Sequence, residues 1–317
     1  MTTRPLFLAA LTFVASPAAA ETVLRVMSYN IYGAGMNDGL PIDQTVAVLR
    51  AANADIVGLQ EVRTEGEVCT ADICPPGEAS VGPAIAEALG MHYYEQTAAN
   101  DALWANGILS RWPITGTAPH DLGVSIDVDG TTIWLFNVHL DDAPYGPYQL
   151  LDIEYGDFPF VETADEAIRW AAETRGPALD LLDEALVAAT GAAAVFITGD
   201  FNEPSARDWT EATVAAGHNP VPVDWPSTGR LEALGFTDTY RAVWPDPVAK
   251  PAYTWTPWYE EEATDDHPDR IDFVLARGTG LTVTDAMIVG EEGPRTDLAV
   301  EPWPSDHRAT LAVVTVP

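Results

Sequence analysis

Apolar runs of strand length alternate along this chain with segments whose apolar residues recur at helical spacing. Runs bounded by turn residues predict strands over 23–31, 55–61, 104–109, 117–122, 131–140, 195–198, 270–276, 281–289 and 308–316. Helical spacing predicts helices over 41–52, 81–89, 163–190, 207–216 and 229–234, with a break or kink at Gly176-Pro177. This mixed alternation, without internal repeats or linkers, predicts one α/β domain.

The segment 141–162 has no clear period and is rich in aromatic residues: Tyr145, Tyr148, Tyr155, Phe158 and Phe160. A loop of this length inside a compact domain is usually functional or mobile. Two interpretations stay open, a packed Ω-loop and a lid that faces the substrate.

The first twenty residues have the pattern of an export signal. A short basic start that includes Arg4 precedes an apolar stretch over 6–14 and the small residues Ala18-Ala19-Ala20. We expect 1–20 to be a cleaved signal peptide and 21–317 the mature domain, secreted or periplasmic. The two cysteines, Cys69 and Cys74, then predict one local disulfide, with two free thiols as the alternative.

The charge of the chain is strongly negative. Fifteen Lys and Arg residues stand against 48 Asp and Glu residues, which gives a net charge of −33. Such a surface repels polyanions and anionic membranes, and no basic patch is visible along the sequence. No further stretch approaches the length of a membrane span, so we expect no transmembrane anchor.

Six polar clusters fall at the ends of predicted strands or just beyond them. They are Tyr29-Asn30, Gln60-Glu61, Asn137-Val138-His139, Asp200-Phe201-Asn202, Asp272 and Asp306-His307. Carboxylate and amide oxygens suit a hard cation such as Mg²⁺, and histidines suit proton transfer and oxyanion contact. An Asp such as Asp272 can orient His307 by accepting its ring N–H. The clusters lack a good covalent nucleophile, so direct attack by water is the natural chemistry.

Each cluster taken singly has a structural alternative. Asn30 fits a turn cap, Glu61 a solvated strand end and His139 a buried core histidine. Asp272 fits an ion pair with Arg270. The acidic run 260–266 is interpreted as a solvated loop, and His92, His120, His218 and His267 as surface or structural residues.

The clusters together resemble the endonuclease/exonuclease/phosphatase superfamily, whose members include pancreatic-type deoxyribonuclease, abasic-site endonucleases, neutral sphingomyelinases and inositol-polyphosphate 5-phosphatases. The matching motifs are Met27-Ser28-Tyr29-Asn30-Ile31, Leu59-Gln60-Glu61-Val62, Asn106-Gly107-Ile108-Leu109-Ser110-Arg111, Asn137-Val138-His139-Leu140, Gly199-Asp200-Phe201-Asn202, Arg270-Ile271-Asp272-Phe273-Val274 and Ser305-Asp306-His307-Arg308. The fold that this resemblance implies is α/β (α+β): a deoxyribonuclease I-like four-layer sandwich of two packed mixed β-sheets flanked by helices.

The resemblance also implies roles. Glu61, with Asn30 and Asp306 beside it, would ligate Mg²⁺ or Mn²⁺, and Asp200 would orient and deprotonate the attacking water. Asn202 and His139 would contact the phosphate, and His307, oriented by Asp272, would stabilise the pentacovalent phosphorus. We also expect Arg111 to contribute to substrate binding.

The sequence therefore predicts an exported, metal-dependent phosphoesterase that cleaves a phosphodiester or phosphomonoester. The scarcity of cations favours a small-molecule or lipid-headgroup substrate over long DNA, and we expect a monomer without a stable nucleic-acid complex. The alternatives are a non-specific endonuclease or exonuclease acting on DNA, and a non-catalytic module of the same fold that binds a phosphorylated ligand.

Overall fold

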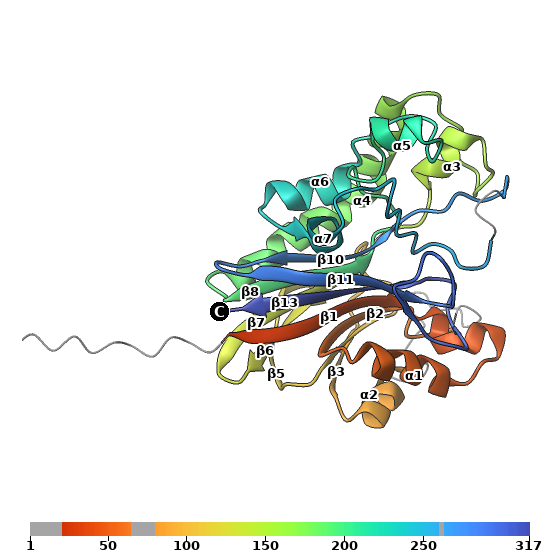
Figure 1. Ribbon diagram of the computed structural model, residues 1–317. Helices are drawn as coiled ribbons and strands as arrows, with labels where there is room; N and C mark the ends of the chain where they lie inside the picture. The colour runs from red at the N-terminus through yellow and green to blue at the C-terminus, as the bar shows by residue number, and fades with distance from the viewer. Residues whose placement is uncertain (1–20, 65–79, 260–262) are drawn as a thin grey trace, which may run out of the picture.

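The strands of this computed structural model form two mixed β-sheets over the residues that it describes, 21–64, 80–259 and 263–317 (Figure 1). One sheet has seven strands in the order β12-β11-β13-β1-β2-β4-β3: β12 (Leu298–Ala299), β11 (Thr282–Gly290), β13 (Ala309–Val316), β1 (Thr22–Asn30), β2 (Ile56–Gln60), β4 (Asn106–Ser110) and β3 (His92–Gln96). The other has six in the order β5-β6-β7-β8-β10-β9: β5 (Ile114–Thr117), β6 (Gly123–Val128), β7 (Thr131–His139), β8 (Ala194–Asp200), β10 (Asp272–Arg277) and β9 (Thr237–Asp238).

Helices cover the outer face of each sheet. The described helices are α1 (Ile42–Ala52), α2 (Gly82–Leu89), α3 (Gly146–Leu151), α4 (Ala164–Leu186), α5 (Glu211–Ala215), α6 (Pro226–Ala233) and α7 (Thr239–Val243), with 3₁₀ segments at η1 (Tyr32–Asp38), η2 (Pro119–Asp121) and η3 (Val187–Ala189). The long helix α4 begins at a local cap, because the Thr163 hydroxyl accepts a hydrogen bond from the backbone N–H of Glu166 at 3.3 Å.

Three apolar clusters hold the layers together. Between the sheets, Val26 and Ile56 from one sheet pack with Leu135 and Phe196 from the other. Outside the first sheet, α1 and α2 bury their apolar faces against β1 and β2, and outside the second sheet α4 and α6 pack on β8 and β10. Figure 1 shows the resulting order of helices, sheet, sheet and helices. This confirms the predicted four-layer sandwich.

The topology brings several strand ends together at one end of the sandwich, on the right in Figure 1. Strands β1 and β2 run parallel, as do β7 and β8, so the carboxyl ends of each pair lie side by side. Strand β10 runs antiparallel to β8 and β13 antiparallel to β1, so their amino ends lie at the same place. The predicted strand-end clusters are therefore neighbours in space.

Some local predictions were wrong. The stretch 117–122 is not one strand, because a turn at Pro119–Asp121 separates β5 from β6. The break offered at Gly176-Pro177, as one alternative to a kink, does not occur, because α4 extends over Ala164–Leu186 with Pro177 inside it. Leu179 and Leu182 of this helix are buried against the second sheet, and this packing outweighs the low helix propensity of Gly and Pro.

Residues 1–20 and the pair Cys69 and Cys74 lie outside the described residues, so the signal peptide and the disulfide remain predictions. Among the residues described, no helix combines the length and apolar character needed to cross a membrane.

Candidate active site

One cleft gathers most of the predicted site residues at the converging strand ends. Its volume is about 420 Å³, and its lining includes Glu61, His139, Asp200, Asn202, Asp306 and His307. Asn30 and Asp272 are fully buried directly behind these residues and hydrogen bond to them. Eight residues predicted from separate motifs therefore form one continuous polar site.

The sheet register places three of these residues in one row across neighbouring strands. Asp200 is the last residue of β8, and it pairs with His139, the last residue of the parallel strand β7. On its other side Asp200 pairs with Asp272, the first residue of the antiparallel strand β10. Hydrogen-bonded ladders hold all three strands, so the spacing of these side chains is fixed by the backbone.

His307 joins the two carboxylates from the loop that leads into β13. Its Nδ1 lies 2.9 Å from Asp272 Oδ2, and its Nε2 lies 3.5 Å from Asp200 Oδ2. Burial works against protonation of this imidazole, but the Asp272 and Asp200 carboxylates outweigh it and raise the pKa of His307 well above its usual value. His307 is therefore positioned to carry a proton towards the cleft. Arg270, the ion-pair partner that the sequence offered for Asp272, is instead buried in ion pairs with Asp208 and Asp238.

Asp200 receives hydrogen bonds from two sides. Its Oδ1 accepts from the backbone N–H of Asn202 at 2.9 Å, and its Oδ2 accepts from the Asn30 amide at 3.1 Å. His139 Nε2 lies 3.7 Å from the same Oδ2. Asp200 is thus held rigidly at the floor of the cleft, between two imidazoles, where it can accept a proton from a bound water.

Glu61 is a buried carboxylate that has one oxygen available to a ligand. Its Oε1 accepts from Asn30 Nδ2 at 2.8 Å, while its buried Oε2 has no hydrogen-bond partner within the described part of the chain. Burial raises the pKa of Glu61 to about 7, with the Asp306 carboxylate adding to the rise and His139 opposing it. An orphaned oxygen on a buried carboxylate beside a second carboxylate fits a hard divalent cation.

Asn30 contributes to this site mainly as a bridge. One amide nitrogen donates to both Glu61 and Asp200, and the amide oxygen accepts from the backbone N–H of Tyr32 at 3.1 Å. A second arrangement suited to a cation is the buried group Asp200, Asp272 and His307, whose ligand atoms all lie within 4.8 Å of one another. Asp272 in that group already accepts from His307 Nδ1, whereas Glu61 keeps an oxygen without a partner among the described residues.

Two site residues adopt backbone conformations that are unusual outside glycine. Glu61 has φ 57° and directly follows β2. Asn202 has φ 47° and lies two residues after the end of β8. The left-handed region costs a non-glycine residue free energy, and such residues concentrate at functional sites. Here the turns aim both side chains into the cleft. Asn202 is further fixed because its Nδ2 donates to the carbonyl of Leu140 at 2.9 Å.

A buried polar network joins the two sheets immediately behind the cleft. The Asn137 amide accepts from Gln60 Nε2 at 2.6 Å and from the Thr198 hydroxyl at 3.1 Å, and it donates to the carbonyl of Leu59 at 2.9 Å. Gly58 faces this network: a Cβ there would lie 1.9 Å from Thr198 Oγ1. Only glycine allows the sheets to approach this closely.

Ser305 and Thr254 anchor the segments that carry His307 and Asp272. The Ser305 hydroxyl donates to the carbonyl of Asn30 at 2.8 Å and accepts from the backbone N–H of His307 at 3.1 Å. The Thr254 hydroxyl accepts from the backbone N–H of Asp272 at 3.2 Å. These contacts tie the segment before β13 and the start of β10 to the rest of the site.

The structure does not bring Arg111 to the cleft. This residue follows the carboxyl end of β4, which runs antiparallel to β2, so it lies at the opposite end of the sheet from Glu61. Its guanidinium is 3.1 Å from Asp55 and donates to the side chain of Asn53 at 2.8 Å. The position of Arg111 inside a motif did not reveal the direction of its strand, and its predicted contact with substrate is not supported by this geometry.

Several residues of the cleft were missed by the sequence interpretation. The indole of Trp255 packs against His307 with ring centroids 4.8 Å apart, and Trp104 lies edge-to-face with His139 at 5.9 Å. Asp101, Asp141 and Asp142 also line the cleft. Trp104 begins a predicted strand, but Trp255 stands in an irregular segment whose sequence carries no periodic signal.

Comparison with known proteins agrees with this geometry. Residues 27–307 match the endonuclease/exonuclease/phosphatase family. This chain belongs to that family, whose members are phosphoesterases and nucleases.

Individual proteins that this chain resembles share less than a third of its sequence. F14F9.5 of Caenorhabditis elegans, an uncharacterised protein, is 29% identical over 328 residues and covers 98% of each chain. A 3′–5′ exonuclease (NExo) from Neisseria meningitidis superposes with a TM-score of 0.53 at 18% identity, covering 91% of this chain and 98% of the other. An AP endonuclease from Archaeoglobus fulgidus superposes with a TM-score of 0.50 at 17% identity, with the same two coverages. These structural likenesses show the shared fold.

Proposed function

We propose that this protein is a divalent-metal-dependent phosphoesterase that hydrolyses its substrate by direct attack of water. The observation that carries the proposal is the contact of His307 with both Asp272 and Asp200, beside the orphaned oxygen of Glu61. A proton acceptor, a protonated histidine and a candidate cation ligand all face one cleft. This is the set of groups that phosphoester hydrolysis requires.

The reaction follows from the positions of these groups. Asp200 takes a proton from a water whose oxygen forms a bond to phosphorus, and the bond between phosphorus and the ester oxygen breaks. His307, held by Asp272, donates a hydrogen bond to a phosphoryl oxygen as negative charge develops, and Asn202 and His139 fix the phosphate from the other side of the cleft. The leaving oxygen takes a proton from solvent. Mg²⁺ or Mn²⁺ held by Glu61 and Asp306 would supply positive charge next to the phosphoryl oxygens.

A small-molecule or lipid-like phosphoester suits the cleft better than long DNA. Within the described ranges, no Lys or Arg lines the cleft, whereas Asp101, Asp141 and Asp142 do. Nucleases hold backbone phosphates with cationic side chains, and these carboxylates repel them. One structure of a 3′ phosphatase NExo from Neisseria is bound to a product DNA hairpin, so DNA is the substrate to compare.

The test is hydrolysis of bis-p-nitrophenyl phosphate with Mg²⁺ or Mn²⁺, with and without EDTA, next to plasmid DNA, sphingomyelin, and sugar and inositol phosphates. We expect activity that EDTA abolishes and added metal restores, with slow plasmid nicking. Activity that persists under chelation would contradict the metal requirement. Tight binding without turnover of any ester would favour a non-catalytic phospho-ligand-binding module, and fast nicking at moderate salt would make the protein a nuclease.

We also propose, from the sequence of residues 1–20 alone, that the protein is exported and cleaved near Glu21. Mass spectrometry of protein recovered from the periplasm or the medium measures the new amino terminus. The same spectrum, without reduction, should be two protons lighter than after reduction if Cys69 and Cys74 form a disulfide. An intact Met1, or two thiols that alkylate freely, would contradict the respective proposal.

A further inference from the structure

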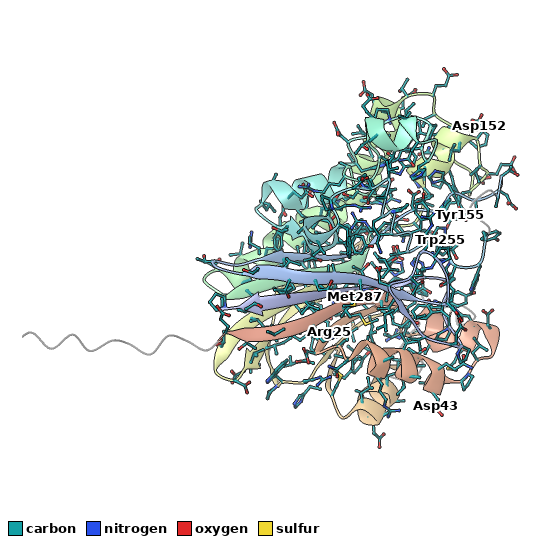
Figure 2. The ribbon with its side chains drawn as sticks, in the orientation of Figure 1. Arg25, Asp43, Asp152, Tyr155, Trp255 and Met287 are labelled. Carbon is teal, nitrogen blue, oxygen red and sulfur yellow. The ribbon has the colours of Figure 1, made fainter. Side chains whose placement is uncertain are left out.

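A second cavity adjoins the catalytic cleft, and its chemistry differs from that of the cleft. Its volume is about 310 Å³, and Asp142, Tyr155, Asn202 and Trp255 line both spaces. Tyr155 and Trp255 lie close to each other at the right-hand end of the sandwich in Figure 2. The two spaces therefore adjoin at Asn202 and Trp255.

Aromatic rings make up much of the wall of the second cavity: Tyr145, Tyr148, Tyr155, Trp255 and Tyr259. Neighbouring rings stand almost perpendicular to one another. Tyr145 and Tyr148 have centroids 4.8 Å apart at 88°, and Tyr148 and Tyr155 are 5.9 Å apart at 87°. Rings at right angles surround a small group on more than one side, as in the aromatic cages that bind quaternary ammonium ions.

The phenol groups of this wall are held in place by carboxylates. Tyr145 donates to Asp269 at 2.8 Å, Tyr148 donates to Asp266, and Tyr155 donates to Asp142. Tyr145 is buried and Tyr148 is half-buried, so these two rings have little freedom to reorient. A wall fixed in this way needs little reorganisation to receive a ligand.

Charge in the second cavity has a single sign. Asp142, Glu154 and Asp265 line it, and over the part of the chain that the structure describes no Lys, Arg or His does. The catalytic cleft next to it is built for a phosphoryl group, whereas this cavity attracts a cation and repels a second phosphate. Aromatic faces together with carboxylates select an organic cation over a neutral group of the same shape.

We propose that the second cavity binds a cationic ammonium group of the substrate, so that the enzyme acts on phosphoesters in which an alkylammonium group lies a short distance from the phosphorus. Phosphocholine and phosphoethanolamine esters have this chemistry, whether as lipid headgroups or as free small molecules. This inference deepens the proposed function and rests on it, because it names the group that lies beyond the scissile phosphate.

The experiment compares two esters that differ only in charge. One is p-nitrophenyl phosphocholine, and the other is its 3,3-dimethylbutyl isostere, in which carbon replaces the quaternary nitrogen. Both release p-nitrophenol, and both present the same phosphodiester to Asp200 and His307. We expect the choline ester to be preferred by about tenfold in kcat/KM, mainly through KM, since the cation contributes to binding in the ground state and the transition state alike.

Matched variants then locate the preference. Glu154 and Asp265 are exposed and line only the second cavity, so the double variant Glu154→Gln/Asp265→Asn removes charge with little change of shape. Tyr259→Leu removes a half-exposed ring from the same wall. Each should reduce the preference for the choline ester, because it lowers kcat/KM for that ester more than for the isostere. Glu87→Gln removes an exposed carboxylate on the distant helix α2 and should leave the preference intact.

The outcomes separate this inference from the proposed function. Equal rates for the two esters, or a preference that both cavity variants retain, would overturn the inference while phosphoesterase activity stands. Failure to cleave either ester, and bis-p-nitrophenyl phosphate as well, in Mg²⁺ and in Mn²⁺ would overturn the proposed function. Once the preference is established, turnover of phosphatidylcholine or sphingomyelin vesicles against glycerophosphocholine distinguishes a lipid headgroup from a free ester.

Discussion

Asp272 lies directly opposite Asp200 in the antiparallel pairing of β10 with β8, and His307 reaches between them from a loop. The two carboxylates hold fixed positions on a hydrogen-bonded ladder, while the imidazole approaches Asp272 to 2.9 Å and Asp200 to 3.5 Å. Asp272 thereby orients His307, and both carboxylates raise the pKa of its imidazole. The proton acceptor and the proton carrier of the reaction share this single arrangement.

Substitution of the two central residues should reduce turnover with the fold intact. Asp200→Asn removes the group that accepts the proton of water, and we expect kcat to fall by about 10²–10⁴-fold. His307→Ala removes the donor to the phosphoryl oxygen, and a fall of about 10²–10³-fold is expected. Steady-state kinetics with bis-p-nitrophenyl phosphate measures both, and thermal unfolding checks the fold. A variant with normal stability and a near-native rate would refute the role assigned to that residue.

Binding of the metal should depend on pH through Glu61. Burial raises the pKa of this carboxyl to about 7, so it is protonated below that pH, and a cation must displace the proton. The apparent affinity for Mn²⁺, measured by calorimetry, should fall about tenfold for each pH unit below 7 and level off above it. In Glu61→Gln, affinity should be weak and this slope should disappear. An affinity that stays constant across neutral pH in the native protein would remove Glu61 from the metal site.

Arg111 should be dispensable for catalysis. Its guanidinium contacts Asp55 and Asn53 at the end of the sheet that lies away from the cleft. Arg111→Ala should therefore leave kcat/KM within about twofold of the native value and change stability by less than about 1 kcal/mol, as is usual for an exposed ion pair. A large loss of activity at unchanged stability would show that this residue reaches substrate after all.

Gly58 and Gly229 should respond in opposite directions to the same substitution. A Cβ at Gly58 would lie 1.9 Å from Thr198 Oγ1 and 2.4 Å from Asn137 Oδ1, so Gly58→Ala should destabilise the protein by about 2–3 kcal/mol. Gly229 lies in helix α6 with no atom within 4 Å of the added methyl, so Gly229→Ala should stabilise it by roughly 0.5–1 kcal/mol. Chemical denaturation measures both values. Equal effects of the two substitutions would mean that the sheets relax around Gly58.

The site was predictable from sequence because its residues follow apolar strands that are easy to recognise. Glu61 and Asp200 stand next to or at the end of strands that are wholly buried, and His139 ends a strand whose four preceding residues are buried; buried strands leave a strong apolar signal. The resemblance to the family then supplied the expected four-layer fold and the roles of these residues. The bridge that Asn30 forms between two carboxylates became visible only in the structure, because a sequence pattern does not show which hydrogen bonds an amide makes.

Some of the elements that were missed lack such a signal. Strand β3 contains His92, Tyr93 and Tyr94 at the edge of a sheet and is only partly buried, so it has no apolar run. Helix α3 spans only six residues of the aromatic segment and begins with Gly146-Pro147. The second cavity was equally hidden, because its wall combines Tyr148 and Tyr155 with Trp255, about a hundred positions further along the chain. Only the fold brings such residues together.

The hydrogen bonds that join the sheets behind the cleft also bear on how the enzyme moves during turnover. Sliding one sheet over the other would break the contacts of Asn137 with Gln60 and Thr198 and leave buried polar groups unpaired. Motion around the cleft is therefore confined to side chains and loops. These rearrange in nanoseconds to microseconds, so no slow movement of one sheet against the other limits the rate. The slow step is then bond cleavage or product departure, and added viscogen should slow turnover only in the second case.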